Sequence, residues 1–363
     1  MTVALDPTQA AGPPLSFAPN RLDAWLRAQL PGLPGLPGLE GPMVLTPIVG
    51  GQSNPTFFID YPGRRLVLRK RPAGELLPSA HAVDREYRIQ AALADSGVPV
   101  PRMLAFHAGP EVVGTAFYVM ERLEGRVFAD CTLPGVAPAE RRAMVLDMAD
   151  TLARLHRVDW RALGLADYGR EGGYFERQLA RWRRQWELSK TRDLPALEEL
   201  MAWLADHRPA GDLTLISHGD FRLGNLMFHP TEPRVVGVLD WELSTLGHPL
   251  ADVAYSALAW RLAPDEYMGM RGADLAVLGI PTEQEYLARY AAGTPGAGPV
   301  TAFHTAPLRS FVWRSSSKAS PRGRGAATHR TAVQRRSGGS RACSRSGRWS
   351  RSLRPETSSR HGS

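Results

Sequence analysis

Two short apolar stretches, each followed directly by acidic or amide residues, constrain this 363-residue chain more than any other feature. The first covers residues 213–217 and runs into a His-Gly-Asp sequence that ends at Asp220, and Asn225 follows after four further residues. The second covers residues 235–239 and is followed by Asp240. Short apolar runs bounded by turn residues are typical of buried strands. The pattern therefore predicts polar side chains gathered at the ends of neighbouring strands.

Phosphoryl transfer requires a set of groups of this kind. A carboxylate must orient the attacking hydroxyl, and Mg²⁺, a hard cation that prefers oxygen ligands, must neutralise the charge of the triphosphate. We therefore expect Asp220 to accept the hydroxyl proton, and Asn225 and Asp240 to bind the metal. The alternative is that Asp220 caps a turn or a helix and that Asn225 occupies a left-handed turn. The first motif occurs by chance on the order of once in a thousand chains of this length, which favours the functional interpretation.

The pattern of apolar residues divides the chain into four parts. Residues 1–42 form an N-terminal extension that ends in a Pro/Gly linker. Residues 43–122 have the alternation typical of strands around one helix, and residues 123–305 have mainly helical spacing. An Arg- and Ser-rich tail, residues 306–363, follows. The expected fold class is α+β, with a small β-rich lobe before a mainly helical lobe.

Individual elements follow from the same spacing and from Gly, Pro and capping signals. One buried helix face is predicted from the spacing of Val145, Met148, Ala149, Leu152, Leu155 and His156. The expected strands cover residues 43–49, 56–60, 65–70, 98–106, 117–122, 213–217, 226–228 and 235–239. The expected helices cover residues 20–30, 82–95, 139–157, 173–189, 194–207, 249–260 and 282–292.

The tail carries all of the chain's excess positive charge. Residues 315–363 hold 12 of the 44 basic residues and one of the 36 acidic residues, so the residues before them have a net charge of −3. A body with this charge lacks the electrostatic footprint of a nucleic-acid-binding protein. Its composition predicts that the tail is disordered. Three explanations stay open: a basic segment that binds nucleic acid, a solvated linker, or out-of-frame translation of a GC-rich gene, which we favour.

Cysteine content and hydropathy indicate the expected location. The two cysteines, Cys131 and Cys343, lie far apart in the sequence, so we expect no disulfide framework and a reducing compartment. The sequence has neither the pattern of a signal peptide nor an apolar run long enough for a membrane helix. We therefore expect a cytoplasmic protein that does not contact membranes. The oligomeric state does not follow from the sequence.

The His-Gly-Asp motif, together with Asn225 and the later Leu-Asp-Trp-Glu sequence around Asp240, resembles the aminoglycoside phosphotransferase/choline kinase family. The resemblance implies a two-lobed, protein-kinase-like fold and transfer of the γ-phosphate of ATP to a hydroxyl of a small molecule, with Mg²⁺ as the metal. It assigns Asp220 as the catalytic residue. It also implies that His218 and Asp252 hold the catalytic loop in place without touching the substrate.

The resemblance further assigns residues to the nucleotide. The Gly-Gly-Gln-Ser-Asn segment matches the loop that covers the phosphates, where backbone N–H groups must approach without Cβ clashes. Arg69 and Lys70 point to opposite faces of a strand, and the family pattern favours Arg69 at the phosphates with Glu86 as its partner. The strand that ends at Glu121 matches the hinge whose backbone meets the adenine edge. The expected nucleotide-binding residues are Gly50, Gly51, Ser53, Asn54, Arg69, Glu86 and Glu121.

A finer resemblance concerns the acceptor. Residues 76–87 and 243–249 resemble the branch related to the kinase domain fused to some acyl-CoA dehydrogenases, and this branch is associated with hydroxyacyl-type substrates. Two alternatives stay open. The unusual tail favours a catalytically impaired, nucleotide-binding pseudokinase. An aminoglycoside-modifying kinase is less favoured, because polycations require a strongly acidic cleft and the body has a net charge of only −3.

Overall fold

A computed structural model describes the His-Gly-Asp segment and most of the chain around it, but not residues 49–53 or 75–81, which belong to two of the expected motifs. The described residues are 17–30, 39–48, 54–74, 82–190, 193–209, 213–267 and 269–294. All of them belong to the first of two units into which the chain divides, residues 1–320. The expected linker at 31–38, the expected phosphate-loop residues Gly50, Gly51 and Ser53, and the tail at 306–363 lie outside the described residues. The expected boundaries of the four parts stay predictions.

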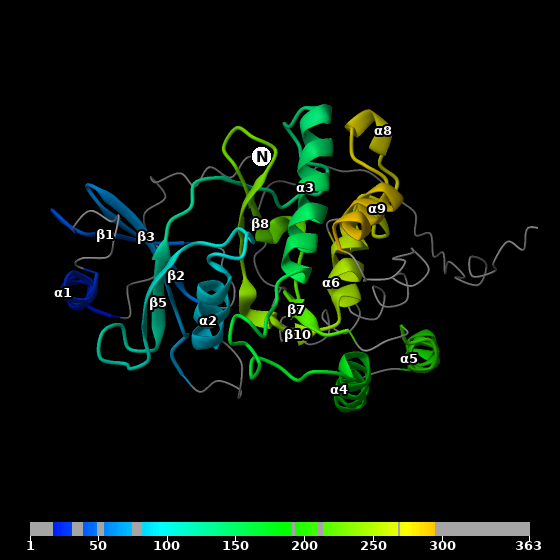
Figure 1. The fold of residues 1–363 in the computed structure, drawn as a ribbon, viewed down its shortest axis with the longest axis horizontal. Coiled ribbons are helices and arrows are strands. Elements are labelled where there is room, and N and C mark those ends of the chain that lie inside the picture. The colour runs from blue at the N-terminus through cyan, green and yellow to red at the C-terminus, as the bar shows by residue number, and fades with distance from the viewer. Residues whose placement is uncertain are drawn as a thin grey trace, which may run out of the picture. The chain divides into compact units, whose positions relative to one another are not determined.

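The first part of the fold is a five-stranded antiparallel sheet with the strand order β1-β2-β3-β5-β4 (Figure 1). Its strands are β1 (Val44–Pro47), β2 (Thr56–Tyr61), β3 (Arg64–Lys70), β4 (Met103–His107) and β5 (Phe117–Glu121). Helix α2 (Val83–Leu93) packs against β4 and β5. Helix α1 (Pro19–Gln29), which falls in the expected N-terminal extension, buries Leu22 and Leu26 in one apolar cluster with Ile59.

The second part is mainly helical, and its main core contains the predicted helix face. Val145, Met148, Ala149, Leu152, Leu155 and His156 are all buried on α3 (Pro138–His156), as the spacing predicted. Helix α3 lies beside α9 (Glu283–Gly293) (Figure 1). The other helices are α4 (Tyr174–Ser189), α5 (Pro195–Asp206), α6 (Pro249–Ser256), α7 (Pro264–Tyr267) and α8 (Leu275–Leu278).

Two small sheets position the segment between residues 213 and 247. Strand β7 (Leu215–Ser217) pairs with β10 (Thr245–Gly247), and β8 (Leu226–Phe228) lies between β6 (Arg126–Val127) and β9 (Val235–Val238). Two short 3₁₀ helices lie in this segment, η1 (Leu223–Asn225) and η2 (Trp241–Leu243), and a third, η3 (Ala257–Trp260), follows α6 directly. Because β8 and β9 are antiparallel neighbours, the residue before β8 and the residues after β9 lie at the same end of the sheet.

Several expected elements differ from the structure for identifiable reasons. The strand expected at 98–106 begins only at Met103, because Pro99 and Pro101 have no N–H to donate to a neighbouring strand. Pro99 instead accepts a hydrogen bond from the Val238 N–H over 2.8 Å. The helix expected at 249–260 ends at Ser256 and continues as a 3₁₀ helix. No helix within the described ranges has both the length and the apolar character needed to cross a membrane.

Candidate functional site

Asp220 and Asn225 lie on one loop between β7 and β8, and they contact each other directly. The Asn225 amide nitrogen donates to the Asp220 carboxylate over 2.8 Å and to the Asp220 carbonyl over 2.9 Å. Asn225 is 5% exposed, so this geometry is fixed by its surroundings. Because the Asn225 amide nitrogen donates to Asp220, the Asn225 amide oxygen points away from the Asp220 carboxylate.

Asp240 follows β9 and is held next to this loop through the backbone. The Leu239 N–H donates to the Asn225 carbonyl over 2.8 Å, which brings the end of β9 beside Asn225. Asp240 has φ of 67° and ψ of 61°, a left-handed conformation that few residues other than glycine adopt. Such strain persists only where the surroundings enforce it, and it often marks functional positions.

The donor set at this place suits Mg²⁺. The Asn225 amide oxygen and the Asp240 carboxylate are hard oxygen donors, and Mg²⁺ is commonly held by one or two such groups together with phosphate oxygens. One Asp240 oxygen accepts from Arg69, and the other forms no hydrogen bond or ion pair with the described residues. No group of three or more His, Cys, Asp or Glu side chains in the described ranges could hold a metal. The assignment of Asn225 and Asp240 to the metal stays a prediction.

Arg69 connects the sheet to the end of β9. Its guanidinium lies 2.8 Å from Glu86 on α2 and 2.9 Å from Asp240, and the Arg69 side chain is 16% exposed. Burial alone would lower the pKa of Arg69, but the nearby Glu86, Tyr118 and Asp240 groups outweigh burial and raise it above the ordinary value. The expected pair of Arg69 with Glu86 is present in the structure.

Glu86 is anchored by two further hydrogen bonds. The Asn54 amide donates to one Glu86 oxygen over 2.6 Å, and the Tyr118 hydroxyl donates to the other over 3.0 Å. The Glu86 side chain is 1% exposed, so these donors replace the water that the carboxylate loses on folding. Asn54, expected to bind nucleotide, thus has its side chain turned inward to Glu86. Its assignment to the nucleotide stays a prediction.

Lys70 points to the opposite face of β3, as strand alternation requires. Its ammonium group donates to the Val113 carbonyl over 2.6 Å and lies 4.9 Å from the centre of the Phe17 ring. Arg69 is therefore the member of this pair that faces Asp240. At the end of β5, Glu121 accepts a hydrogen bond from the Arg102 N–H over 3.0 Å. The expected contact of the Glu121 backbone with adenine stays a prediction.

His218 ties together the two strand ends that carry the acidic residues. One ring nitrogen, Nε2, lies 3.0 Å from the Leu239 carbonyl, and the other, Nδ1, lies 3.2 Å from the Asp220 N–H. A carbonyl accepts and an N–H donates, so the ring carries its proton on Nε2 and is neutral. Burial lowers the pKa of His218, which favours the same form. The contacts agree with the expected role of holding the loop.

Asp252, at the start of α6, accepts hydrogen bonds from two adjacent backbone groups of the loop. The His218 N–H donates to one oxygen over 2.7 Å and the Gly219 N–H to the other over 2.8 Å. Gly219 has φ of 83°, and a Cβ there would lie 2.6 Å from the Leu243 carbonyl, so the loop requires glycine. Burial raises the pKa of Asp252, but the bond to His156, the nearby His218 and the Gly219 N–H outweigh burial and lower it.

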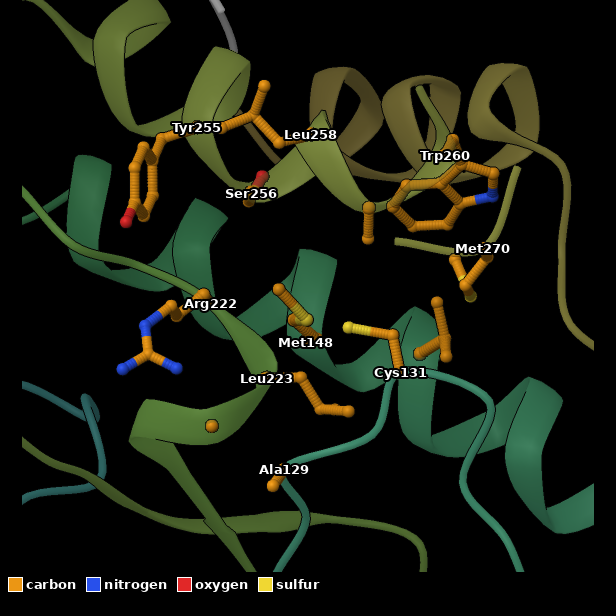
Figure 2. A pocket seen from close by; sticks show the side chains of 13 residues that line it. Ala129, Cys131, Met148, Arg222, Leu223, Tyr255, Ser256, Leu258, Trp260 and Met270 are labelled. Atoms are coloured by element: carbon orange, nitrogen blue, oxygen red, sulfur yellow. The ribbon is translucent and has the colours of Figure 1, made fainter. Parts of the chain in front are cut away.

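An apolar pocket lies next to the loop that carries Asp220, and three residues of that loop, 222–224, line it. Its walls come from the β6–α3 loop, α3, the loop after Asp220, and the segment 255–270. Figure 2 shows the Arg222 guanidinium at one side of the pocket and Trp260 and Met270 at the other. Arg222 Nε lies 3.4 Å from the Asp220 carboxylate. It is the one charged residue among the described residues that line the pocket.

Sequence reasoning missed two residues that touch this site. Tyr118 was expected only as part of a strand, and its bond to Glu86 joins residues 32 positions apart. Arg222 lies two residues after Asp220, and its place inside the motif was the signal that could have identified it. His156, expected to be a satisfied core residue, lies 3.3 Å from an Asp252 oxygen.

Comparisons with known proteins agree with this geometry. Residues 44–294 match a family model described as the phosphotransferase enzyme family. Acyl-CoA dehydrogenase family member 10 of Mus musculus is 48% identical over 253 residues, which cover 69% of this chain and 24% of that protein. The chain therefore spans about a quarter of the length of this curated relative.

Solved structures show the same architecture. A protein from Ralstonia eutropha, described as a candidate aminoglycoside phosphotransferase, is 44% identical with a TM-score of 0.73, and the match covers 83% of this chain and 88% of that one. Choline kinase from Cryptosporidium parvum is 14% identical with a TM-score of 0.55, covers 83% of this chain and 89% of that one, and shows a likeness of fold alone. The predicted α+β, two-lobed, protein-kinase-like fold is confirmed.

Because His218 is buried, we expect the free energy of unfolding to fall as the pH falls. Because burial lowers its pKa, the folded protein keeps His218 neutral at pH values where the unfolded chain, with an ordinary pKa near 6.5, already binds a proton. The free energy of unfolding should therefore fall as the pH drops below about 6.5, by up to about 1.4 kcal/mol per pH unit from this residue.

Denaturant unfolding between about pH 8 and about pH 5 measures this dependence. We expect a shallower decrease in His218→Gln than in the wild type. His207→Gln serves as the control, because His207 is exposed and its replacement should leave the decrease unchanged. Equal decreases in the wild type and in His218→Gln would contradict the assignment of a buried, neutral imidazole.

Proposed function

The chain belongs to the phosphotransferase enzyme family, and from this premise we propose that it is an ATP- and Mg²⁺-dependent kinase that phosphorylates a hydroxyl group of a small molecule. One observation carries the proposal. The Asn225 amide donates to the Asp220 carboxylate over 2.8 Å, while the residue before Asp240 donates to the Asn225 carbonyl over 2.8 Å. A proton acceptor and two metal-binding oxygens thus lie on adjoining segments, as phosphoryl transfer requires.

Asp220 orients the acceptor hydroxyl and takes its proton as the hydroxyl oxygen attacks the γ-phosphorus of ATP. A new bond forms from that oxygen to phosphorus, the bond to the β–γ bridging oxygen breaks, and ADP leaves. Asn225 and Asp240 would hold Mg²⁺, which would supply positive charge to the phosphates when bound. The Asn225 amide keeps Asp220 beside the metal ligands throughout.

Arg69 is assigned to the phosphates of ATP on the basis of its position. Its side chain lies between Glu86 and Asp240, with an ion pair to each. Phosphate oxygens offer the planar guanidinium a stronger pair of acceptors than one Asp240 oxygen, so the nucleotide takes the place of Asp240 at Arg69. By resemblance, Gly50, Gly51 and Ser53, which lie outside the described residues, are assigned to the phosphates, and the backbone at Glu121 is assigned to the adenine edge.

The pocket beside Arg222 is assigned to the acceptor. Its lining residue Arg222 lies 3.4 Å from the Asp220 carboxylate. Its walls include the apolar side chains of Val145, Met148, Leu258, Trp260 and Met270. An alcohol with an apolar chain, such as a hydroxyacyl compound, buries that chain there and gains about 25 cal/mol for each Å² of apolar surface covered. A polycationic aminoglycoside instead meets the charge of Arg222, which disfavours it.

A catalytically impaired, nucleotide-binding protein remains the alternative function. It is favoured by the Arg/Ser composition of residues 306–363, which differs from the helical pattern before it. The two functions differ in one measurable respect. An impaired protein is stabilised against thermal unfolding by Mg²⁺ and ATP but transfers phosphate to no acceptor.

The first test removes the proposed proton acceptor. Asp220→Asn keeps the shape of the side chain but cannot accept the hydroxyl proton, so turnover should fall about 10²- to 10⁴-fold while the dissociation constant for Mg-ATP changes less than about twofold. ADP release and calorimetric titration measure the two quantities. Asp206→Asn, an exposed carboxylate at the end of α5, is the matched control and should retain full turnover. Unchanged turnover in Asp220→Asn would refute the assignment.

The second test compares acceptors. Purified full-length protein is incubated with Mg-ATP and, separately, with hydroxyacyl compounds of increasing chain length, choline and an aminoglycoside, and phosphorylated products are quantified by mass spectrometry. We expect kcat/KM to rise about three- to fourfold with each methylene that the apolar pocket buries, up to the length it holds. A preference for the aminoglycoside would contradict the acceptor assignment and leave the kinase assignment intact.

A further inference from the structure

Two buried polar side chains outside the proposed reaction lie in contact with each other. Tyr290 on α9 is 0% exposed and His156 on α3 is 2% exposed. The Tyr290 hydroxyl lies 2.7 Å from His156 Nδ1, although the two residues are 134 positions apart in the sequence. The other ring nitrogen, His156 Nε2, lies 3.3 Å from an Asp252 oxygen. His156 therefore joins α9 to the residue that anchors the catalytic loop.

The carboxylate fixes the direction of one hydrogen bond, and a neutral imidazole fixes the direction of the other. An ionised carboxylate only accepts, so His156 Nε2 carries a proton and donates it to Asp252. In the neutral ring Nδ1 is then an acceptor, and the Tyr290 hydroxyl donates to it. Asp252 in turn accepts from the His218 and Gly219 N–H groups over 2.7 and 2.8 Å. A continuous series of hydrogen bonds thus runs from α9 to the residues directly before Asp220.

We propose that Tyr290 and His156 are positioning residues for the phosphoryl transfer, acting through Asp252 on the catalytic loop. This role rests on the proposed function. Asp252 can accept from two adjacent N–H groups only in one orientation of its carboxylate, and His156 Nε2 supports that orientation by donating to the oxygen that also accepts from the His218 N–H. Tyr290 in turn holds the His156 ring. Loss of either group lets the loop before Asp220 rotate, and small displacements of a reacting group reduce turnover strongly.

Tyr286 provides a matched comparison on the same helix. It lies one turn before Tyr290, is also 0% exposed, and donates its hydroxyl to Ser256 Oγ over 3.0 Å. Ser256 Oγ donates to the Val253 carbonyl over 2.9 Å, within α6. Within the described residues, the hydrogen bonds of the Tyr286 hydroxyl lead into α6 and do not reach the His218 and Gly219 N–H groups. Tyr290→Phe and Tyr286→Phe therefore each remove one tyrosine hydroxyl from α9. Only Tyr290→Phe removes a hydroxyl from the hydrogen bonds that lead through His156 to Asp252.

The test measures hydrogen exchange in the full-length chain, in peptides that cover residues 217–224 and, as reference, peptides from α3. In Tyr290→Phe we expect the loop amides to exchange about tenfold faster relative to α3, and in Tyr286→Phe less than about twofold faster. The same variants are assayed for Mg-ATP hydrolysis with water as the acceptor. Tyr290→Phe should lower kcat about tenfold with KM for ATP unchanged, and Tyr286→Phe should not.

A second variant tests the order of the contacts. In His156→Gln the amide nitrogen can still donate to Asp252, but the side chain no longer offers Nδ1 to Tyr290. Tyr290→Phe should therefore have no further effect on loop exchange in a His156→Gln background. Additive effects, or equal loop exchange in Tyr290→Phe and Tyr286→Phe, would overturn the positioning role whatever the activity. A different outcome separates the two proposals. If loop exchange is faster in Tyr290→Phe but not in Tyr286→Phe, and the wild-type protein transfers no phosphate, the positioning role is supported and the proposed function is refuted.

Discussion

The site depends on one buried carboxylate, Asp252, which is 1% exposed and must have all its hydrogen bonds satisfied. Its two oxygens accept from the adjacent N–H groups of His218 and Gly219, and this double contact requires the left-handed conformation at Gly219. An unpaired carboxylate in this place would destabilise the fold by several kcal/mol, on the order of 3–5. The loop therefore has one strongly favoured shape, and Asp220 takes its position from that shape.

The site also depends on the ion pairs of Arg69, which link the two lobes. Arg69 of the sheet contacts Glu86 on α2 and Asp240 after β9, so a single guanidinium aligns the nucleotide-facing strand with the proposed metal ligand. Removing one partner of such a pair leaves a buried charge uncompensated. Under the proposed function, the phosphates of Mg-ATP would take the place of Asp240 at Arg69, and the metal would bind the Asp240 carboxylate.

The sequence predicted what depends on local spacing. The apolar face of α3, the strands on both sides of the His-Gly-Asp motif and the pairing of Arg69 with Glu86 follow from periodicity, from strand alternation and from the resemblance to a family. It did not predict the left-handed backbone of Asp240 or the inward turn of the Asn54 side chain. These features, like the contact of His156 with Tyr290, depend on segments distant in the sequence, which no local pattern encodes. The two-residue β6 and the three-residue β10 are too short to show a strand pattern.

A crystal structure of the full-length chain with Mg²⁺ and a non-hydrolysable ATP analogue tests the central claim most directly. We predict that the Asn225 amide oxygen and the Asp240 carboxylate both coordinate the ion at about 2.1 Å, while the Asp220 carboxylate faces the γ-phosphate. The Arg69 guanidinium should contact phosphate oxygens of the analogue in place of the Asp240 carboxylate. An ion held without either Asn225 or Asp240, or a nucleotide bound away from Arg69, would contradict the account.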